Sequence, residues 1–155
     1  MNPVVTLTDA PDREAEHAIE SGLARYNAEQ AGIADSRPLA VLVSDPVTLE
    51  VVGGLLGRTS LGVLFVDLFF LPDALRGHRL GSRILQVAED EARRRGCEAA
   101  VLYTISFQAP EFYERHGYRR FGTIDCQPPG TSRIFLSKAL GRTPIHPDQR
   151  EQPSD

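Results

Sequence analysis

The chain has 155 residues, of which 41% are hydrophobic and 25% charged, and its formal net charge is -4 at pH 7. This length suits one globular domain with its own core. The mild acidity argues against a general nucleic-acid binder, because such proteins carry a basic face over much of the domain. No apolar run approaches the ~20 residues that span a bilayer, and the first residues lack the pattern of a signal peptide.

Cysteine usage and the end of the chain give two further expectations. Cys97 and Cys126 match no metal-binding or redox spacing, so we expect reduced thiols in a cytoplasmic protein without a metal. The residues after Leu140 include three prolines and few apolar side chains. We therefore expect a domain over residues 1–140 and a flexible tail over 141–155.

Hydrophobic spacing predicts strands and helices in alternation, which indicates an α/β fold in layers. The predicted helix near the N-terminus has Asp9 or Asp12 available as its N-cap. In the predicted strand 49–58, Gly53 and Gly54 indicate a bulge or a closely approaching backbone. Strands are predicted over 4–7, 39–44, 49–58, 63–71, 99–105, 118–125 and 133–140, and helices over 11–30, 80–95 and 109–116.

The most informative stretch is the turn between the strand 63–71 and the helix that begins at Leu80. Residues 74–88 contain no acidic side chain but include Arg76, Arg79 and Arg83, with His78 among them. A glycine-containing turn that leads into a helix start offers unpaired backbone N–H groups and the positive end of the helix dipole. Together with arginines, this pattern favours an anion site, most naturally for a phosphate or diphosphate. The alternative is a solvated basic turn before an ordinary amphipathic helix.

Residues 69–118 resemble the GNAT superfamily of N-acetyltransferases on three features. The turn RGHRLG fits the acetyl-coenzyme A (acetyl-CoA) signature Arg/Gln-x-x-Gly-x-Gly/Ala, with Arg76 in the first place and Gly81 in the last, although Arg79 replaces the central glycine. The strand AAVLYTI follows the helix. The segment APEFYERHGY is similar to Ala-x-x-Phe-Tyr-x-x-x-Gly-Phe/Tyr. The resemblance implies a single-domain α/β (α+β) fold with a mixed, mostly antiparallel central sheet flanked by helices.

The resemblance also implies where acetyl-CoA would lie, as a co-substrate and without a metal. The diphosphate would lie over the turn and the helix start, and the pantetheine arm would pair with the backbone of the central strand. Ser106 stands where many family members have asparagine. The cofactor-binding residues expected on this basis are Phe69, Leu71, Arg76, Gly77, His78, Arg79, Leu80, Gly81, Ser82, Arg83 and Ser106.

For catalysis, the resemblance places Tyr113 where the family has a general acid that protonates the leaving thiolate. The alternative is a tyrosine that packs in the core. Asp67 is a charge in an apolar strand, so it should face a cleft or be paired. It is a candidate general base or amine anchor, with a surface ion pair as the alternative. Glu111 is a weaker candidate base.

The leading hypothesis is therefore transfer of an acetyl group to a primary amine on a small molecule or peptide. The other hypotheses are a degenerate CoA-binding or protein-interaction module without turnover, and a nucleotide-binding α/β domain, although no phosphate loop or dinucleotide fingerprint is present. We expect no nucleic-acid or membrane partner. A homodimer is common in the family. The acceptor does not follow from the sequence.

Overall fold

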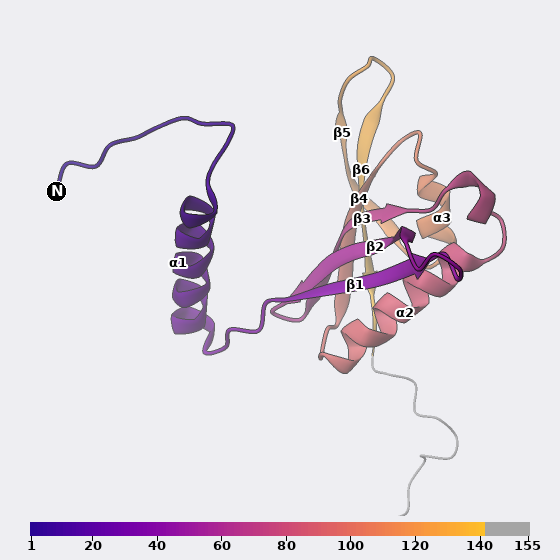
Figure 1. Cartoon of the computed structure of the whole chain (residues 1–155), viewed down its shortest axis with the longest axis horizontal. Helices are drawn as coiled ribbons and strands as arrows, with labels where there is room; N and C mark the ends of the chain where they lie inside the picture. Colours follow the sequence, from indigo (N-terminus) through magenta and orange to yellow (C-terminus); the bar gives the residue numbers. More distant parts are fainter. Residues whose placement is uncertain (142–155) are drawn as a thin grey trace, which may run out of the picture. The chain divides into compact units, whose positions relative to one another are not determined.

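The computed structural model of the protein describes residues 1–141 (Figure 1). Nearly all of the predicted tail, residues 142–155, lies outside the described residues. The chain divides into two compact units, Met1–Asp35 and Ser36–Asp155. The predicted extent of the domain, residues 1–140, stays a prediction.

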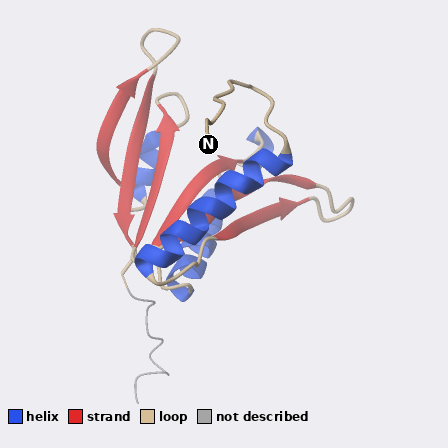
Figure 2. Cartoon of the chain, turned by 90° about the vertical axis from the view of Figure 1, so that its left-hand side faces the viewer, coloured by secondary structure: helices blue, strands red, loops and turns tan. Residues whose placement is uncertain are grey.

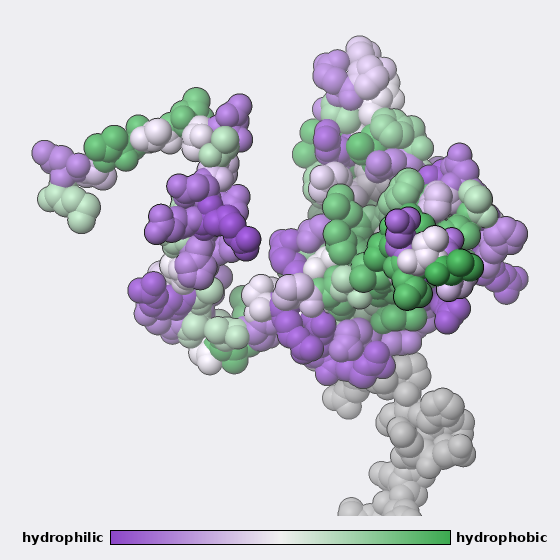
Figure 3. Space-filling view, in the orientation of Figure 1, coloured by the Kyte–Doolittle hydropathy of each residue, from purple (hydrophilic) through white to green (hydrophobic). Residues whose placement is uncertain are grey.

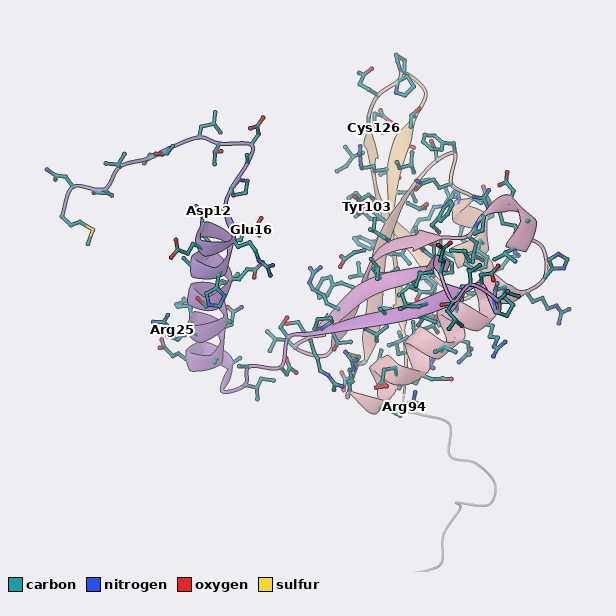
Figure 4. All side chains as sticks on the ribbon, viewed as in Figure 1. Asp12, Glu16, Arg25, Arg94, Tyr103 and Cys126 are labelled. Carbon is teal, nitrogen blue, oxygen red and sulfur yellow. The ribbon has the colours of Figure 1, made fainter. Side chains whose placement is uncertain are left out.

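The first unit contains the predicted N-terminal helix, α1, which spans Arg13–Ala31. Of the two proposed caps, Asp12 is confirmed, because its Oδ1 accepts a hydrogen bond of 2.8 Å from the backbone N–H of Ala15 (Figure 4). At the other end, Gly32 adopts a left-handed conformation and its N–H donates to the carbonyl of Ala28. Glycine is favoured there because it has no Cβ to clash.

The predicted strand over residues 4–7 is wrong, since these residues have no regular secondary structure. The apolar run is only four residues long, and the Thr8 hydroxyl accepts a hydrogen bond from the N–H of Ala10 immediately after it. A strand needs a neighbouring strand to pair its backbone groups, and the unit Met1–Asp35 contains no other strand.

The second unit contains a six-stranded sheet in the order β1-β2-β3-β4-β6-β5, as far as the described residues show. Only β3 and β4 pair in parallel, and the other neighbours are antiparallel. This arrangement confirms the expected mixed, mostly antiparallel sheet. The strands are β1 Arg37–Ser44, β2 Val51–Ser60, β3 Val63–Phe70, β4 Ala99–Ile105, β5 Arg119–Asp125 and β6 Ser132–Ala139.

Helix α2, Leu80–Arg94, packs against β1, β2 and β3, and its apolar face contributes to the core. Basic residues occupy its last turn, where Arg94 lies (Figure 4), and Gly96 follows in a left-handed conformation. A 3-10 turn, η1 (Asp73–Leu75), precedes α2, and a short helix, α3 (Pro110–Arg115), follows β4. Among the described residues, no helix has the length and apolar character needed to cross a membrane.

The core lies between α2 and the sheet, where Leu55, Leu64, Leu85 and Leu136 are almost completely buried. Other apolar side chains of the sheet remain exposed, among them Leu56, which is 47% exposed. Figure 3 shows one face of the molecule, on which apolar surface gathers over the sheet unit and polar surface surrounds it.

The β3–β4 pair opens toward one end of the sheet. Its parallel pairing begins at Val63–Ala99 and stops at Val66–Leu102, although both strands continue for several residues. In Figure 2 the strands accordingly form two groups that meet at one end and separate toward the other. Backbone groups of β3 and β4 that face this opening have no strand partner, so they are available to another extended group.

The two glycines of β2 confirm both readings of the sequence. The register shifts between Val43 and Ser44 opposite this part of β2, which is a bulge. A Cβ on Gly54 would collide with the carbonyl oxygen of Val41, and one on Gly53 would lie 2.6 Å from the carbonyl oxygen of Phe70. Glycine is therefore required for the three strands to pair this closely.

We expect Gly54→Ala to lower the free energy of unfolding by about 2–4 kcal/mol, because the methyl group collides with backbone and Gly54 has a φ of +139°. Gly122→Ala in β5 is the matched control. A methyl group there meets no atom within 4 Å, so its effect should stay within about 1 kcal/mol. Urea denaturation of both variants measures the difference, and equal stabilities would contradict the close strand approach.

Candidate active site

The site begins at a bulge in β3. Gly57 pairs with Val66 and Leu56 pairs with Leu68, so Asp67 has no partner residue on β2. An extra residue in one strand bends it and increases its local twist. The bulge comes directly after the last residue of β3 that pairs with β4. It therefore marks the point where the two strands separate.

The bulge also reverses which side chains of β3 face the core. Before it, Leu64 and Val66 are buried. Beyond it, Phe69 is partly buried against the core and Leu71 is buried. Because side chains alternate along a strand, one extra residue moves the following side chains to the opposite face. The bulge thus directs Phe69 and Leu71 inward and leaves Asp67 at the surface.

Asp67 forms an ion pair with Arg58, which is one of the two environments predicted for it from the sequence. Both of its carboxylate oxygens accept from one guanidinium nitrogen of Arg58, at 2.9 and 3.0 Å. The two side chains are each 48% exposed, and the Arg58 guanidinium lies 4.4 Å from the ring centre of Phe65. An ion pair this exposed contributes about 0–1 kcal/mol to stability. A role for Asp67 toward an acceptor amine stays a prediction.

Arg76 shapes the turn that follows β3. Its Nε donates to the carbonyl of Leu71 at 2.8 Å, and its guanidinium pairs with Asp73 at 2.9 Å. Leu71 is buried at the end of the strand, so this hydrogen bond ties the turn to the strand. Arg76 thus organises the loop between β3 and α2.

The start of α2 presents the anion-binding features that the sequence predicts. Arg79 is the N-cap residue, no side chain caps the helix, and the first turn contains no acidic residue. The N–H of Arg83 donates to the carbonyl of Arg79, whereas the N–H groups of residues 80–82 precede the first intrahelical bond. Arg79 and Arg83 are exposed, and neither makes an ion pair within residues 1–141. Their charges are therefore available to an anionic ligand.

Arg79 adopts the backbone conformation that a glycine would take at this place. Its φ is +59° and its ψ is 10°, and Gly77 also has a positive φ of +82°. The replacement of the central glycine has therefore not changed the left-handed bend. For a residue with a Cβ this conformation costs about 1–2 kcal/mol. His78, between the two, is exposed.

Helix α3 packs against the start of α2. A Cβ on Gly81 would lie 3.4 Å from Cζ of Phe112, so the signature glycine makes room for this ring. The Ser82 hydroxyl and Nε2 of His116 form a partly buried hydrogen bond of 2.9 Å. The ring centres of Phe112 and His116 are 4.8 Å apart. The predicted diphosphate cradle and the segment that carries Tyr113 are thus in direct contact.

Tyr113 lies beside the opening of the sheet. It is buried, and its ring is edge-on to that of Phe69, at 6.3 Å between ring centres. Burial raises the pKa of the Tyr113 hydroxyl from 10.0 to about 12. Among the described residues, the Tyr113 hydroxyl is seen to make no hydrogen bond to another protein group. This phenol is therefore protonated at neutral pH and uncommitted.

Tyr118 differs from Tyr113 although both are buried and their rings are 5.9 Å apart. The Tyr118 hydroxyl donates to Oε2 of Glu89 at 3.1 Å. Burial and the Glu89 carboxylate raise the pKa of the Tyr118 hydroxyl well above its usual range. Tyr113 is therefore the better placed of the two to protonate a ligand.

Ser106 is another of the predicted cofactor-binding residues. Ser106 is engaged with β6: its hydroxyl accepts from the N–H of Ser132 at 3.1 Å, and its N–H donates to the Ser132 carbonyl at 2.8 Å. No contact between Ser106 and α2 is observed in the described part of the chain. Its expected role in cofactor binding stays a prediction. Residues 1–141 contain no group of His, Cys, Asp and Glu side chains arranged to hold a metal.

Sequence reasoning missed three residues that the structure joins to the site: Phe112, His116 and Glu89. His116 and Ser82 are far apart in the chain, so no local pattern could pair them. Glu89 did leave a signal, because it is a charge on the apolar face of α2, between the buried Leu85 and Ala92. Such a charge indicates a buried partner.

A sheet that opens beside a helix start with unpaired N–H groups fits the resemblance to coenzyme A-dependent acetyltransferases. Comparison with known proteins agrees. The sequence pattern of the acetyltransferase (GNAT) family matches residues 6–118, and the chain belongs to this family. Family members use acetyl-CoA as the acetyl donor.

Individual relatives support the assignment. An acetyltransferase of Agrobacterium fabrum is 39% identical over 132 residues, which cover 85% of this chain and 96% of the relative. The blasticidin-S acetyltransferase of Streptomyces morookaense is 42% identical over 92 residues, which cover 59% of this chain and 68% of that enzyme. The crystal structure of an acetyltransferase from Agrobacterium tumefaciens superposes with a TM-score of 0.79 at 39% identity, covering 90% and 99% of the two chains.

The raised pKa of Tyr113 makes stability depend on pH. Between pH 10 and 12 the unfolded chain loses the Tyr113 proton while the folded protein keeps it, so the free energy of unfolding should fall as pH rises through this range. We expect Tyr113→Phe to remove of the order of 2–3 kcal/mol of this fall. Denaturant titrations at several alkaline pH values measure it. Tyr103→Phe, which deletes the hydroxyl of a half-exposed tyrosine on β4 (Figure 4), controls for the loss of a phenol.

Proposed function

We propose that the protein transfers an acetyl group from acetyl-CoA to a primary amine by direct attack, with Tyr113 as the general acid. The observation that carries this proposal is the uncommitted Tyr113 hydroxyl at the opening between β3 and β4. Family membership supplies the donor, and the geometry of this chain supports the mechanism.

In this proposal the cofactor extends from the start of α2, along β3, to Tyr113. The N–H groups of residues 80–82 bind the diphosphate, and Arg79 and Arg83 neutralise its charge. The pantetheine arm pairs with the unpaired side of β3 near Phe69 and Leu71. Since Arg76 already occupies the Leu71 carbonyl, we assign to Leu71 its N–H as the contact. The thioester then lies close to Tyr113.

The chemical step needs one acid and one base. The neutral amine nitrogen attacks the thioester carbonyl carbon, the C–N bond forms, and the C–S bond breaks as coenzyme A leaves. Tyr113 donates its proton to the thiolate, and the tyrosinate regains a proton from solvent. With its pKa raised to about 12, the phenol is present in the donor form at neutral pH.

For the proton that the amine must lose, Asp67 is the proposed acceptor, directly or through water. It lies at the bulge where the sheet opens, and its carboxylate is exposed. Arg58 Nη1 already donates to both carboxylate oxygens of Asp67, so an acceptor amine at this carboxylate would share it with Arg58. Glu111 on α3 is the weaker candidate and lies 3.9 Å from Arg120.

The acceptor is proposed as a primary amine on a small molecule or peptide. A relative that covers 59% of this chain is named for acetylation of blasticidin S, which makes blasticidin S a reasonable first compound in a screen. The screen follows free thiol released from acetyl-CoA across small amines, polyamines, amino acids and peptides. The alternative function, CoA binding without turnover, is favoured if acetyl-CoA binds and no acceptor releases thiol.

We expect Arg79→Ala and Arg83→Ala each to weaken acetyl-CoA binding about three- to tenfold, since each removes one charge–phosphate contact. Arg94→Ala is the matched control, because Arg94 lies at the other end of the same helix and pairs with Glu91. Isothermal titration measures the affinities, and added salt should reduce the difference between parent and variants. If Arg79→Ala and Arg83→Ala both bound acetyl-CoA like the parent, the helix start would not be the diphosphate site.

We expect Tyr113→Phe to lower kcat about tenfold or more while the affinity for acetyl-CoA stays within twofold, since a general acid is worth about 10²–10⁴-fold. Tyr103→Phe should turn over like the parent. Steady-state kinetics with an acceptor from the screen, together with titration of acetyl-CoA, separates the two effects. An unchanged rate would assign Tyr113 to the core.

A further inference from the structure

A buried carboxylate lies behind the proposed acid and takes no part in the mechanism above. Glu89 of α2 is only 1% exposed. Its Oε1 accepts from Nζ of Lys138 on β6 at 2.6 Å, and its Oε2 accepts from the Tyr118 hydroxyl at 3.1 Å. Arg93, one turn further along α2, lies 3.7 Å away. A charge buried this deeply persists only because these partners satisfy it.

Glu89 is linked to Tyr113 indirectly, because Tyr118, which bonds Glu89, makes two contacts with Tyr113. The Tyr118 N–H donates to the Tyr113 carbonyl at 3.1 Å, and the two rings are edge-on at 5.9 Å. Glu89 fixes the far end of the Tyr118 ring by holding its hydroxyl. Tyr118, which Glu89 of α2 holds in place, therefore contacts both the backbone and the ring of Tyr113.

A second tie joins α2 to the same segment. Ser82 precedes Glu89 by seven residues, which is about two helical turns, so both side chains lie on one face of α2. Ser82 bonds His116 and Glu89 bonds Tyr118, on either side of Gly117. The end of α3 is thus attached to the helix whose first turn forms the proposed diphosphate cradle.

We propose that Glu89 is a positioning residue for acetyl transfer. It commits the Tyr118 hydroxyl and braces Tyr113, so that only the Tyr113 hydroxyl is presented to the thioester. This inference rests on the proposed role of Tyr113. A contribution to core stability alone would lower the melting temperature and leave the behaviour of Tyr113 and the turnover of the folded protein unchanged.

Two substitutions remove the tie with little change of shape. Tyr118→Phe deletes one hydroxyl, and the family segment accepts phenylalanine at this place. Glu89→Gln keeps an acceptor oxygen but loses the charge that pairs with Lys138. The matched controls are Tyr103→Phe and Glu91→Gln; the Glu91 carboxylate pairs with Arg94 and Arg95 near the C-terminal end of α2.

The first measurement does not require turnover. The chain has four tyrosines, so protein labelled with 3-fluorotyrosine gives a simple ¹⁹F spectrum, in which Tyr113→Phe assigns the Tyr113 signal. We expect this signal to shift and broaden in Tyr118→Phe and Glu89→Gln, with and without coenzyme A, and to stay unchanged in both controls. An unmoved signal in both variants overturns the inference.

The second measurement is kinetic. We expect Tyr118→Phe and Glu89→Gln to lower kcat about three- to tenfold with KM for acetyl-CoA unchanged, since a displaced acid loses part of its effect. In a Tyr113→Phe background the same changes should have no further effect. Additive losses overturn the inference. If Tyr113→Phe alone left turnover unchanged, the proposed acid would fail, whereas the ¹⁹F result would still decide whether Glu89 positions Tyr113.

Discussion

The end of the parallel pairing between β3 and β4 is the constraint on which the site depends. Pairing stops at Val66 and Leu102, and the bulge at Asp67 follows at once. Backbone groups beyond this point need a partner, and an extended ligand can supply it. The same bulge turns Phe69 toward the core, where its ring meets Tyr113. One extra residue in β3 therefore both opens the sheet and positions the side chain against which the proposed acid packs.

Helix α2 connects the two ends of this site. Its first turn has open N–H groups beside Arg79, and its buried face carries Glu89 two turns from Ser82. Its last turn is anchored as well. The Nε of Arg93 donates to the carbonyl of Leu140, and Arg95 donates to the Pro38 carbonyl and the Thr59 hydroxyl. Because these contacts fix α2 along its length, we expect the distance between the proposed diphosphate site at its start and Tyr113 to stay nearly constant.

Much of this fold could be predicted because local patterns determine it. The helix that begins at Leu80 and the strand Ala99–Ile105 follow from periodicity. Gly53 and Gly54 predict the close approach of neighbouring strands that the structure shows. The failures are of another kind. Residues 4–7 have strand propensity but no partner strand within Met1–Asp35, and the bulge at Asp67 arises because Leu56 pairs with Leu68 while Gly57 pairs with Val66. The hydrogen bond between Ser82 and His116 joins distant parts of the chain, which spacing alone cannot reveal.

Arg79 shows how a departure from the family pattern can be interpreted physically. The turn imposes a left-handed conformation that glycine adopts freely and that costs a residue with a Cβ about 1–2 kcal/mol. Strain of this kind tends to accumulate at functional sites, where other interactions offset it. Within the described residues the Arg79 side chain makes no ion pair that would offset the strain. An arginine held at this cost beside open N–H groups is consistent with a compensation that comes from an anionic ligand, which is the role that the proposed function gives it.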